Sequence, residues 1–153
     1  MKHLVFDCDG TLLNTSVSPY RLFPGIKELI TELSADYTLY VWTARGRTST
    51  LRILQEGGVM QFFEGVYTAD DGVGKPHVAG LIHLVGDASK DSILMIGDTI
   101  NDILGAKNFG IKSMGVVWNG EAKAHILREI GADLIATNPA ECSKLIRLES
   151  KER

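Results

Sequence analysis

Two aspartates, Asp7 and Asp9, stand directly after a short apolar run near the start of the chain, and their types and spacing suit chemistry. In an extended strand side chains alternate between faces, so both carboxylates point to one side and Cys8 points to the other. Two like charges at the end of a buried strand repel each other and lose hydration. A cation between them, or a proton held by one of them, removes that cost, and both conditions suit phosphoryl transfer.

Further polar residues follow other apolar runs of the chain in the same way. Thr43 closes one run, Lys75 follows another, and Asp98 and Asp102 follow a fourth. In an open parallel sheet the carboxyl ends of the strands meet at one edge, where ligands bind. The sequence therefore predicts that six polar side chains, far apart along the chain, gather in a single pocket.

The elements that must position these groups alternate between strands and helices. Short β-rich runs predict strands at residues 3–7, 38–43, 65–69, 93–97, 113–118 and 133–137. Amphipathic or turn-bounded segments predict helices at residues 26–33, 47–56, 78–85, 101–108, 121–130 and 140–148. In the third of these helices, Val78, Leu81, Ile82 and Val85 form the predicted buried face. The alternation favours an α/β fold with an open, mostly parallel sheet covered by helices on both faces.

Composition limits the class of protein. The chain has 153 residues, of which 44% are hydrophobic and 23% charged, with a net charge of −3. These values are typical of one soluble globular domain, and they give no sign of a nucleic-acid partner. No apolar stretch approaches the length that crosses a membrane, and the N-terminus is unlike a signal peptide. Two isolated cysteines, Cys8 and Cys142, favour a cytoplasmic setting and no structural zinc.

The order of the polar motifs resembles that of the haloacid dehalogenase (HAD) superfamily, over nearly the whole chain. The matching residues are Asp7-x-Asp9-Gly10-Thr11, then Thr43, then Lys75, then Gly97-Asp98-x-x-x-Asp102. Gly74-Lys75-Pro76-His77 and the segment 115–120 resemble the phosphoglycolate phosphatase branch in particular. The resemblance implies a Rossmann-like HAD core and a Mg²⁺-dependent phosphatase that hydrolyses a phosphomonoester through an aspartyl-phosphate.

The residue types suit the steps of such a reaction. Asp7 would attack phosphorus as the nucleophile, and Asp9 would protonate the leaving group and then take a proton from water. Lys75, the Thr43 hydroxyl and the Ala44 amide would bind the phosphoryl oxygens. Catalysis would then consist mostly of positioning and charge neutralisation.

The resemblance also implies a Mg²⁺ site of carboxylate and carbonyl oxygens. Its protein ligands would be Asp7, the backbone carbonyl of Asp9 and Asp98, with Asp102 supporting the ion directly or through water. Four carboxylates against Lys75 leave a net charge of −3, so an ion should relieve repulsion and raise the melting temperature. The alternative is that Asp98 and Asp102 simply cap the helix that follows them.

One departure from the phosphoglycolate phosphatase pattern concerns the lid. That branch carries a helical cap domain between the first two motifs, whereas here only residues 14–23 precede a helix start at Pro24. A segment this short cannot form a domain with its own core. We therefore expect one capless domain over residues 1–153, with a flap at about 14–23 or a second subunit of a homo-oligomer covering the open site. Such a site would accept a phosphorylated small molecule or an exposed phosphate on a larger one.

Three alternatives would use the same groups differently. A haloacid dehalogenase also has an aspartate nucleophile, but no alkoxide to protonate, so Asp9 favours a phosphatase. A phospho-receiver places its phosphorylated aspartate on a central strand after an earlier acidic pair, an order that this chain does not follow. A regulatory module without catalysis could use the same fold.

Other residues are expected to have ordinary structural roles. Arg45 and Arg47 could reach the substrate, but we expect both to be exposed, and we expect Asp70 and Asp71 to be solvated loop acids. Trp118 is expected to pack at the end of a strand. The four histidines show no spacing that indicates a metal site.

Overall fold

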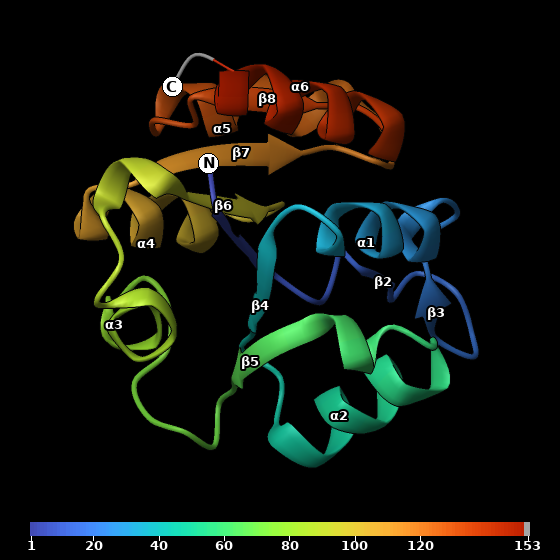
Figure 1. Ribbon diagram of the computed structural model, residues 1–153. Coiled ribbons are helices and arrows are strands. Elements are labelled where there is room, and N and C mark those ends of the chain that lie inside the picture. Colours follow the sequence, from blue (N-terminus) through green and yellow to red (C-terminus); the bar gives the residue numbers. More distant parts are fainter. Residues whose placement is uncertain (152–153) are drawn as a thin grey trace.

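The computed structural model describes residues 1–151 as a central sheet between two layers of helices (Figure 1). Parallel strands form the sheet in the order β5-β4-β1-β6-β7-β8. Their bounds are β1 His3–Phe6, β4 Thr38–Trp42, β5 Phe63–Tyr67, β6 Ile93–Gly97, β7 Lys112–Val116 and β8 Leu134–Ala136. The predicted open parallel α/β sheet is confirmed, and each strand lies within about two residues of its predicted place.

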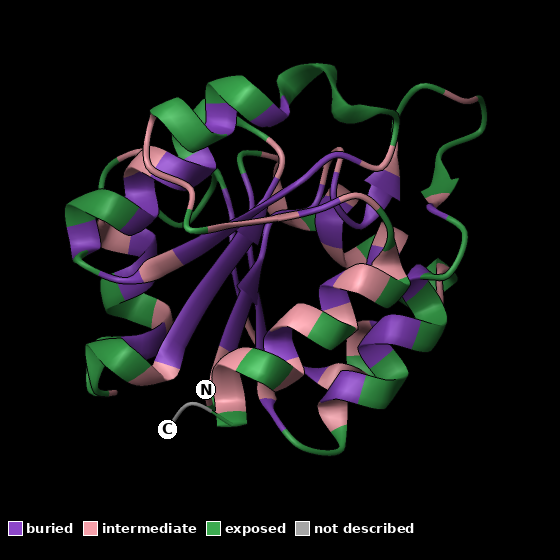
Figure 2. Ribbon diagram, turned by 90° about the horizontal axis from the view of Figure 1, so that it is seen from above, coloured by how far each residue is buried: buried purple, intermediate pink, exposed green. Residues whose placement is uncertain are grey.

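Side chains of the central strands alternate between the two faces of the sheet. In β1, Leu4 and Phe6 join one buried cluster and Val5 joins the other. The first face is covered by α1 (Ile26–Ser34), α2 (Arg47–Glu56) and α6 (Pro139–Lys151). The second is covered by α3 (Ala79–Val85), α4 (Ile100–Phe109) and α5 (Ala124–Glu129). Figure 2 shows the purple, buried strands enclosed by helices with green outer faces, which explains why the strand sequences are continuous apolar runs.

The helices differ from the predictions in three places, one of which is that α6 runs to Lys151 rather than to residue 148. The segment 121–130 contains a 3₁₀ turn, Glu121–Lys123, before α5 begins. In α3 the residue Ile82, predicted on the buried face, is 57% exposed. The cause is Gly80, which lies against the ring of Trp42, so the face around Gly80 and Leu81 turns toward the sheet and Ile82 turns away. No helix within residues 1–151 combines the length and the apolar character needed to span a bilayer.

The segment predicted to be a flap forms a small hairpin. Its strands, β2 (Leu13–Asn14) and β3 (Arg21–Leu22), pair antiparallel. The amide of Phe23 donates to the carbonyl of Leu12 at 3.0 Å and closes the base. The sequence did not predict these strands, because two-residue strands carry no alternating pattern.

The register of the central strands brings their ends to one level. Phe6, the last residue of β1, is aligned with Val41 on one side and Ile96 on the other. The amide of Asp7 then donates to the carbonyl of Ile96 at 2.9 Å, which extends the pairing by one residue. The loops that follow β1, β4 and β6 therefore leave the sheet at the same edge.

Candidate active site

The turn that follows β1 holds Asp7 at this edge. The amide of Leu12 donates to the carbonyl of Cys8 at 2.8 Å, and Cys8 is buried in the core. Gly10 has a φ of +83°, a left-handed conformation that glycine adopts without strain. A Cβ atom at Gly10 would lie 2.1 Å from Oδ2 of Asp98. Glycine at this position therefore lets the turn approach the loop after β6 closely.

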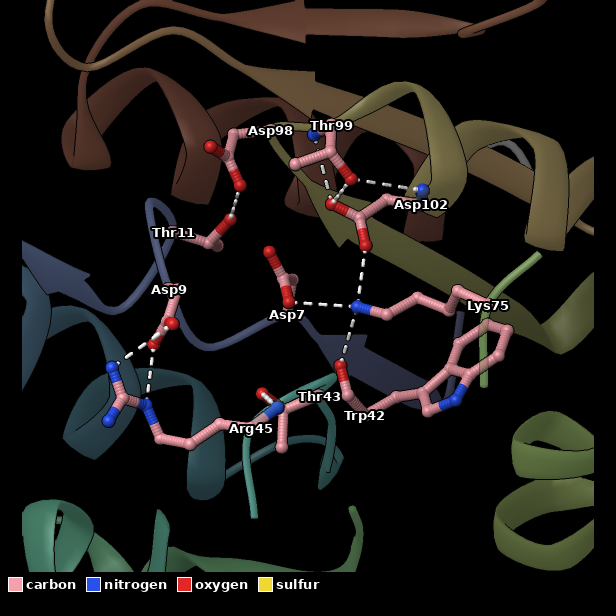
Figure 3. A network of polar contacts seen from close by, with 10 residues as sticks. All are labelled: Asp7, Asp9, Thr11, Trp42, Thr43, Arg45, Lys75, Asp98, Thr99 and Asp102. Atoms are coloured by element: carbon pink, nitrogen blue, oxygen red, sulfur yellow. Dashed lines mark hydrogen bonds and ion pairs between the residues drawn. The ribbon is translucent and has the colours of Figure 1, made fainter. Parts of the chain in front are cut away.

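Three carboxylates converge beside this turn, as the sequence predicts. Asp7, Asp98 and Asp102 each offer an oxygen atom, and these atoms lie within 4.8 Å of one another. Nζ of Lys75 donates to Oδ1 of Asp7 at 2.8 Å and to Oδ1 of Asp102 at 2.7 Å. Its third hydrogen bond goes to the carbonyl of Trp42 at 2.9 Å. Figure 3 shows Lys75 reaching between the two carboxylates.

Burial governs the electrostatics of this cluster. Burial, followed by the charge of Asp102, raises the pKa of Asp7 well above its ordinary value, although Lys75 acts in the opposite direction. Burial likewise raises the pKa of Asp98. Burial alone would lower the pKa of Lys75, but the charges of Asp102 and Asp7 outweigh it and raise that pKa. The cluster thus combines a charged lysine with carboxylates whose ionisation costs free energy, a cost that a divalent cation would offset.

Asp102 is held by the first turn of α4. The amide and the hydroxyl of Thr99 donate to Oδ2 of Asp102 at 3.0 and 2.9 Å, and the Thr99 hydroxyl oxygen accepts from the Asp102 amide. Because Oδ1 binds Lys75, both carboxylate oxygens of Asp102 accept hydrogen bonds from the protein. Asp102 therefore caps the helix and also fixes Lys75.

Asp98 is partly exposed and faces the turn after β1. The hydroxyl of Thr11 donates to Oδ1 of Asp98 at 3.1 Å. Nε1 of Trp118 in turn donates to the carbonyl of Thr11 at 2.7 Å. Trp118 thus packs at a strand end, as expected, and it also lines a small hollow beside Gly10 and Asp98.

One open pocket of about 430 Å³ is lined by four of the six residues predicted to gather there, but not by Asp98 or Asp102. The residues that line it are Asp7, Asp9, Thr43, Ala44, Arg45, Lys75, Thr99 and Asn101. The predicted phosphate-binding residues therefore share one pocket with both predicted catalytic aspartates. A neighbouring groove of about 490 Å³ shares Thr99 and Asn101 and adds Lys123 and Ile126. The sequence did not single out Thr99 or Asn101, although both stand in the fourth motif.

Arg45 is a charged residue of the pocket for which the sequence favoured the wrong environment. It was expected to be exposed, but its side chain is only 17% exposed and forms an ion pair with Asp9. This pair turns the Asp9 carboxylate away from the other three (Figure 3). With Asp9 neutralised, Asp7, Asp98, Asp102 and Lys75 leave a net charge of −2 rather than −3. The only signal in the sequence was the position of Arg45, two residues after Thr43.

The loop after β5 holds charged residues with structural roles. Asp71, expected to be a solvated acid, accepts from Nη2 of Arg47 at 2.6 Å and from the amide of Thr68 at 2.7 Å. The hydrogen bond from Arg47 is the main cause that lowers the pKa of Asp71 to about 2. Asp70 accepts from the amide of Arg47 at 2.7 Å. These contacts tie the loop to the start of α2, outside the pocket lining.

The fold and the cluster at the sheet edge define a class of protein, the HAD-like hydrolases. A family model for haloacid dehalogenase-like hydrolases matches residues 18–116, and the chain belongs to this family. The matched region contains Lys75, Asp98 and Asp102 and begins after Asp7. The match thus covers the second, third and fourth motifs and supports the family resemblance found in the sequence, but it does not include the first motif.

Individual relatives are similar over part of their own length. Phosphoglycolate phosphatase of Agrobacterium fabrum is 33% identical over 134 residues, which cover 82% of this chain and 57% of that protein. Pyrophosphatase PpaX of Bacillus mycoides is 32% identical over 109 residues, or 68% of this chain and 50% of the relative. The chain therefore spans about half the length of the curated relatives it matches.

A solved structure supports the fold. A haloacid dehalogenase-like protein of unknown function from Agrobacterium tumefaciens superimposes with a TM-score of 0.85, at 15% identity. The superposition covers 97% of this chain and 99% of the other. The Rossmann-like HAD core expected from the motifs is therefore confirmed.

Proposed function

We propose that this chain is a Mg²⁺-dependent phosphatase that hydrolyses a phosphomonoester through an aspartyl-phosphate on Asp7. One observation carries the proposal, namely that Asp7 is buried beside Asp98, Asp102 and Lys75 at an open pocket. A buried group of like charges is costly for a folded protein unless a ligand compensates it. A divalent cation together with a phosphoryl group supplies that compensation. Family membership and relatives that are named phosphatases support the same function.

The donor set of the cluster fits magnesium, which prefers hard oxygen ligands. We propose Asp7 and Asp98 as side-chain ligands and the backbone carbonyl of Asp9 as a third. Asp102, whose oxygens already accept hydrogen bonds within the protein, would act through water and by orienting Lys75. When bound, the ion would neutralise charge on the phosphoryl oxygens and among the carboxylates. A net charge of −2 before binding supports one divalent cation per site.

The proposed reaction has two halves. In the first, the carboxylate of Asp7 attacks phosphorus, the bond from phosphorus to the leaving oxygen breaks, and Asp9 protonates that oxygen. In the second, water attacks the phosphorus of the aspartyl-phosphate while Asp9 takes a proton from the water. Inorganic phosphate leaves and the Asp7 carboxylate is regenerated. Asp9 gives up one proton in the first half and takes one up in the second, so the protein ends the cycle unchanged.

The phosphoryl group would be held by residues of two loops. Lys75 is fixed by three hydrogen bonds, so its charge is in place before substrate binds. The oxygen of the Thr43 hydroxyl accepts from the amide of Arg45 at 3.0 Å, which leaves the hydroxyl proton available for a phosphoryl oxygen. The backbone amide of Ala44 lies at the same pocket and would add a second donor.

We propose that the site is open and that the hairpin takes the place of a cap domain. Tyr20, in the loop of the hairpin, has its ring 5.4 Å from the guanidinium of Arg45, so this flap reaches the pocket edge. An open site supports a phosphorylated small molecule, or an exposed phosphate on a larger one, as substrate. A second copy of the chain is the other candidate cover for the site.

Replacement of Asp7 by asparagine tests the proposal. Asp7→Asn should lower kcat for p-nitrophenyl phosphate at least about a thousandfold, because the amide has the same shape but is not a nucleophile. Circular dichroism and thermal melting should show that the variant remains folded. Asp87→Asn is the matched control, because Asp87 is exposed and lies outside the pocket lining, and it should retain wild-type turnover.

Other outcomes of the same assay would favour the alternatives. A stable phosphoprotein that forms without turnover would favour a receiver-like module. Hydrolysis that survives removal of Mg²⁺, with release of halide from a haloacid, would favour a dehalogenase. Full activity in Asp7→Asn would contradict the assignment of the nucleophile.

A further inference from the structure

Arg45 and Asp9 form a contact inside the pocket that the reaction above does not use. Nε and Nη2 of Arg45 donate to Oδ1 and Oδ2 of Asp9 at 2.9 and 3.1 Å. Nη1 of Arg45 donates to the hydroxyl of Ser49 at 2.8 Å, and Tyr20 lies against the guanidinium. One cation therefore engages both carboxylate oxygens of Asp9.

This pairing conflicts with the proton transfers proposed for Asp9. A residue that protonates a leaving group and then takes a proton from water must turn an oxygen toward the reacting atoms. In the observed pair both oxygens face Arg45 (Figure 3). The Asp9 side chain is 45% exposed, so the pair is open to solvent on one side and a change of partner costs little.

The backbone of Arg45 is fixed, while its side chain lies along the pocket. Its amide donates to Oγ1 of Thr43, and its carbonyl accepts from the amide of Ala69 at 3.1 Å. The side chain lines the same pocket as Asp7 and Lys75. A planar guanidinium binds a carboxylate or a phosphate in the same two-bond geometry that it uses with Asp9. An anionic group on a ligand could therefore take the place of Asp9.

We propose that Arg45 recognises a second anionic group on the substrate. The substrate class is then a small phosphate ester or anhydride that carries a carboxylate or another phosphate a few bonds from the reacting phosphorus. Binding of that group moves the guanidinium from Asp9 to the substrate, so that Asp9 can take a proton from solvent and turn the resulting carboxylic acid toward the leaving oxygen. The part assigned to Asp9 rests on the proposed phosphatase function, whereas the binding preference does not require turnover.

Binding is measured first, with Mg²⁺, in Asp7→Asn protein, which is expected not to turn substrate over. 2-Phosphoglycolate and ethyl phosphate share a two-carbon skeleton and differ in the carboxylate. Pyrophosphate and methyl phosphate form a second pair, which tests a phosphate as the second anion. We expect calorimetry to show, in at least one pair, at least about tenfold tighter binding of the member with the second anionic group, and Arg45→Gln to remove that difference.

Two further variants test whether Arg45 recognises the second anionic group by its geometry or only adds positive charge near the pocket. Arg52→Gln removes the same charge from α2, where the side chain is 68% exposed, and it should leave the preference intact. Arg45→Lys keeps the charge but loses the two-bond geometry, and it should retain part of the preference. In protein with Asp7 intact, Arg45→Gln should lower kcat/KM for the member with the second anionic group more than for the simple alkyl phosphate of the same pair.

The outcomes distinguish this inference from the proposed function. Equal binding within both pairs, or a preference that survives Arg45→Gln, would overturn the role of Arg45. An equal loss of kcat/KM for both members would assign Arg45 to positioning Asp9 alone and would also overturn it. A preference in binding, with no turnover of any phosphate ester by the wild-type protein, would uphold recognition by Arg45 and refute the phosphatase.

Discussion

At the scale of single residues, each carboxylate of the site has a hydrogen-bond or ion-pair partner within the protein. Asp7 is paired with Lys75, Asp9 with Arg45, Asp98 with Thr11 and Asp102 with Thr99. Two partners are cations and two are hydroxyl groups, so the carboxylates are not equivalent. Of the four, Asp7 and Asp102 are the most deeply buried, and both depend on the same lysine.

Replacement of Lys75 by methionine should destabilise the metal-free protein by about 3–5 kcal/mol, because it leaves two buried carboxylates without a counter-charge. Urea denaturation at neutral pH measures this loss. Lys112→Met is the matched control, because Lys112 is 41% exposed in its pair with Glu149, and it should cost less than about 1 kcal/mol. Similar small losses for both variants would show that Asp7 and Asp102 do not depend on Lys75.

The sequence predicted the aspartates but not all of their partners, for a physical reason. Asp7 and Asp98 directly follow apolar strands, and the geometry of a parallel sheet then determines where they lie. The direction of a long side chain such as that of Arg45 depends on the path of its loop, which no periodic pattern records. The sequence did not predict the ion pair between Arg45 and Asp9. The expected net charge of the site was therefore −3, whereas the structure gives −2.

At the scale of elements, two short segments position the acidic cluster, the turn after β1 and the first turn of α4. The first brings Gly10 against Asp98, and the second holds Asp102 through the capping box with Thr99. Both segments are local structures that begin where a central strand ends. Their distortion should therefore disturb the metal site more than it disturbs the sheet.

Replacement of Gly10 by alanine tests this view, with Gly110→Ala as a matched control. Both glycines have a φ of +83°, so both replacements should cost roughly 1–2 kcal/mol in backbone strain. Only the Cβ at Gly10 would meet Asp98, whereas nothing lies within 4 Å of a Cβ at Gly110. Mg²⁺ should raise the melting temperature of wild type and Gly110→Ala, but much less that of Gly10→Ala. Equal increases in all three would contradict the proposed role of Asp98.

Helices and strands were predicted well where a hydrophobic pattern extends over several residues, and poorly where the element is too short to show one. The central strands are buried on both faces, so their apolar runs mark them clearly. The hairpin of β2 and β3 has only two residues in each strand and shows no period. In α3, contact between Gly80 and Trp42 determines which face is buried, and this contact is invisible to a count of apolar positions.

At the scale of the whole molecule, the parallel sheet collects groups that lie far apart along the chain. Asp7, Lys75 and Asp102 follow different strands, yet Lys75 bonds to both aspartates. Folding thus creates a site with a net charge of −2 at an open pocket, and this charge is what a divalent cation and a phosphoryl group would compensate. The absence of a large insertion before Pro24 is consistent with the proposed open access to that pocket.

The central claim is that this pocket transfers a phosphoryl group to Asp7 beside a metal ion. The most direct test is a crystal structure of the protein with Mg²⁺ and beryllium fluoride, which mimics a phosphoryl group on a carboxylate. We expect beryllium fluoride bonded to an oxygen of Asp7, within reach of Lys75 and Thr43, and Mg²⁺ bound by Asp7 and Asp98. Beryllium fluoride on another residue, or no metal among these carboxylates, would contradict the account.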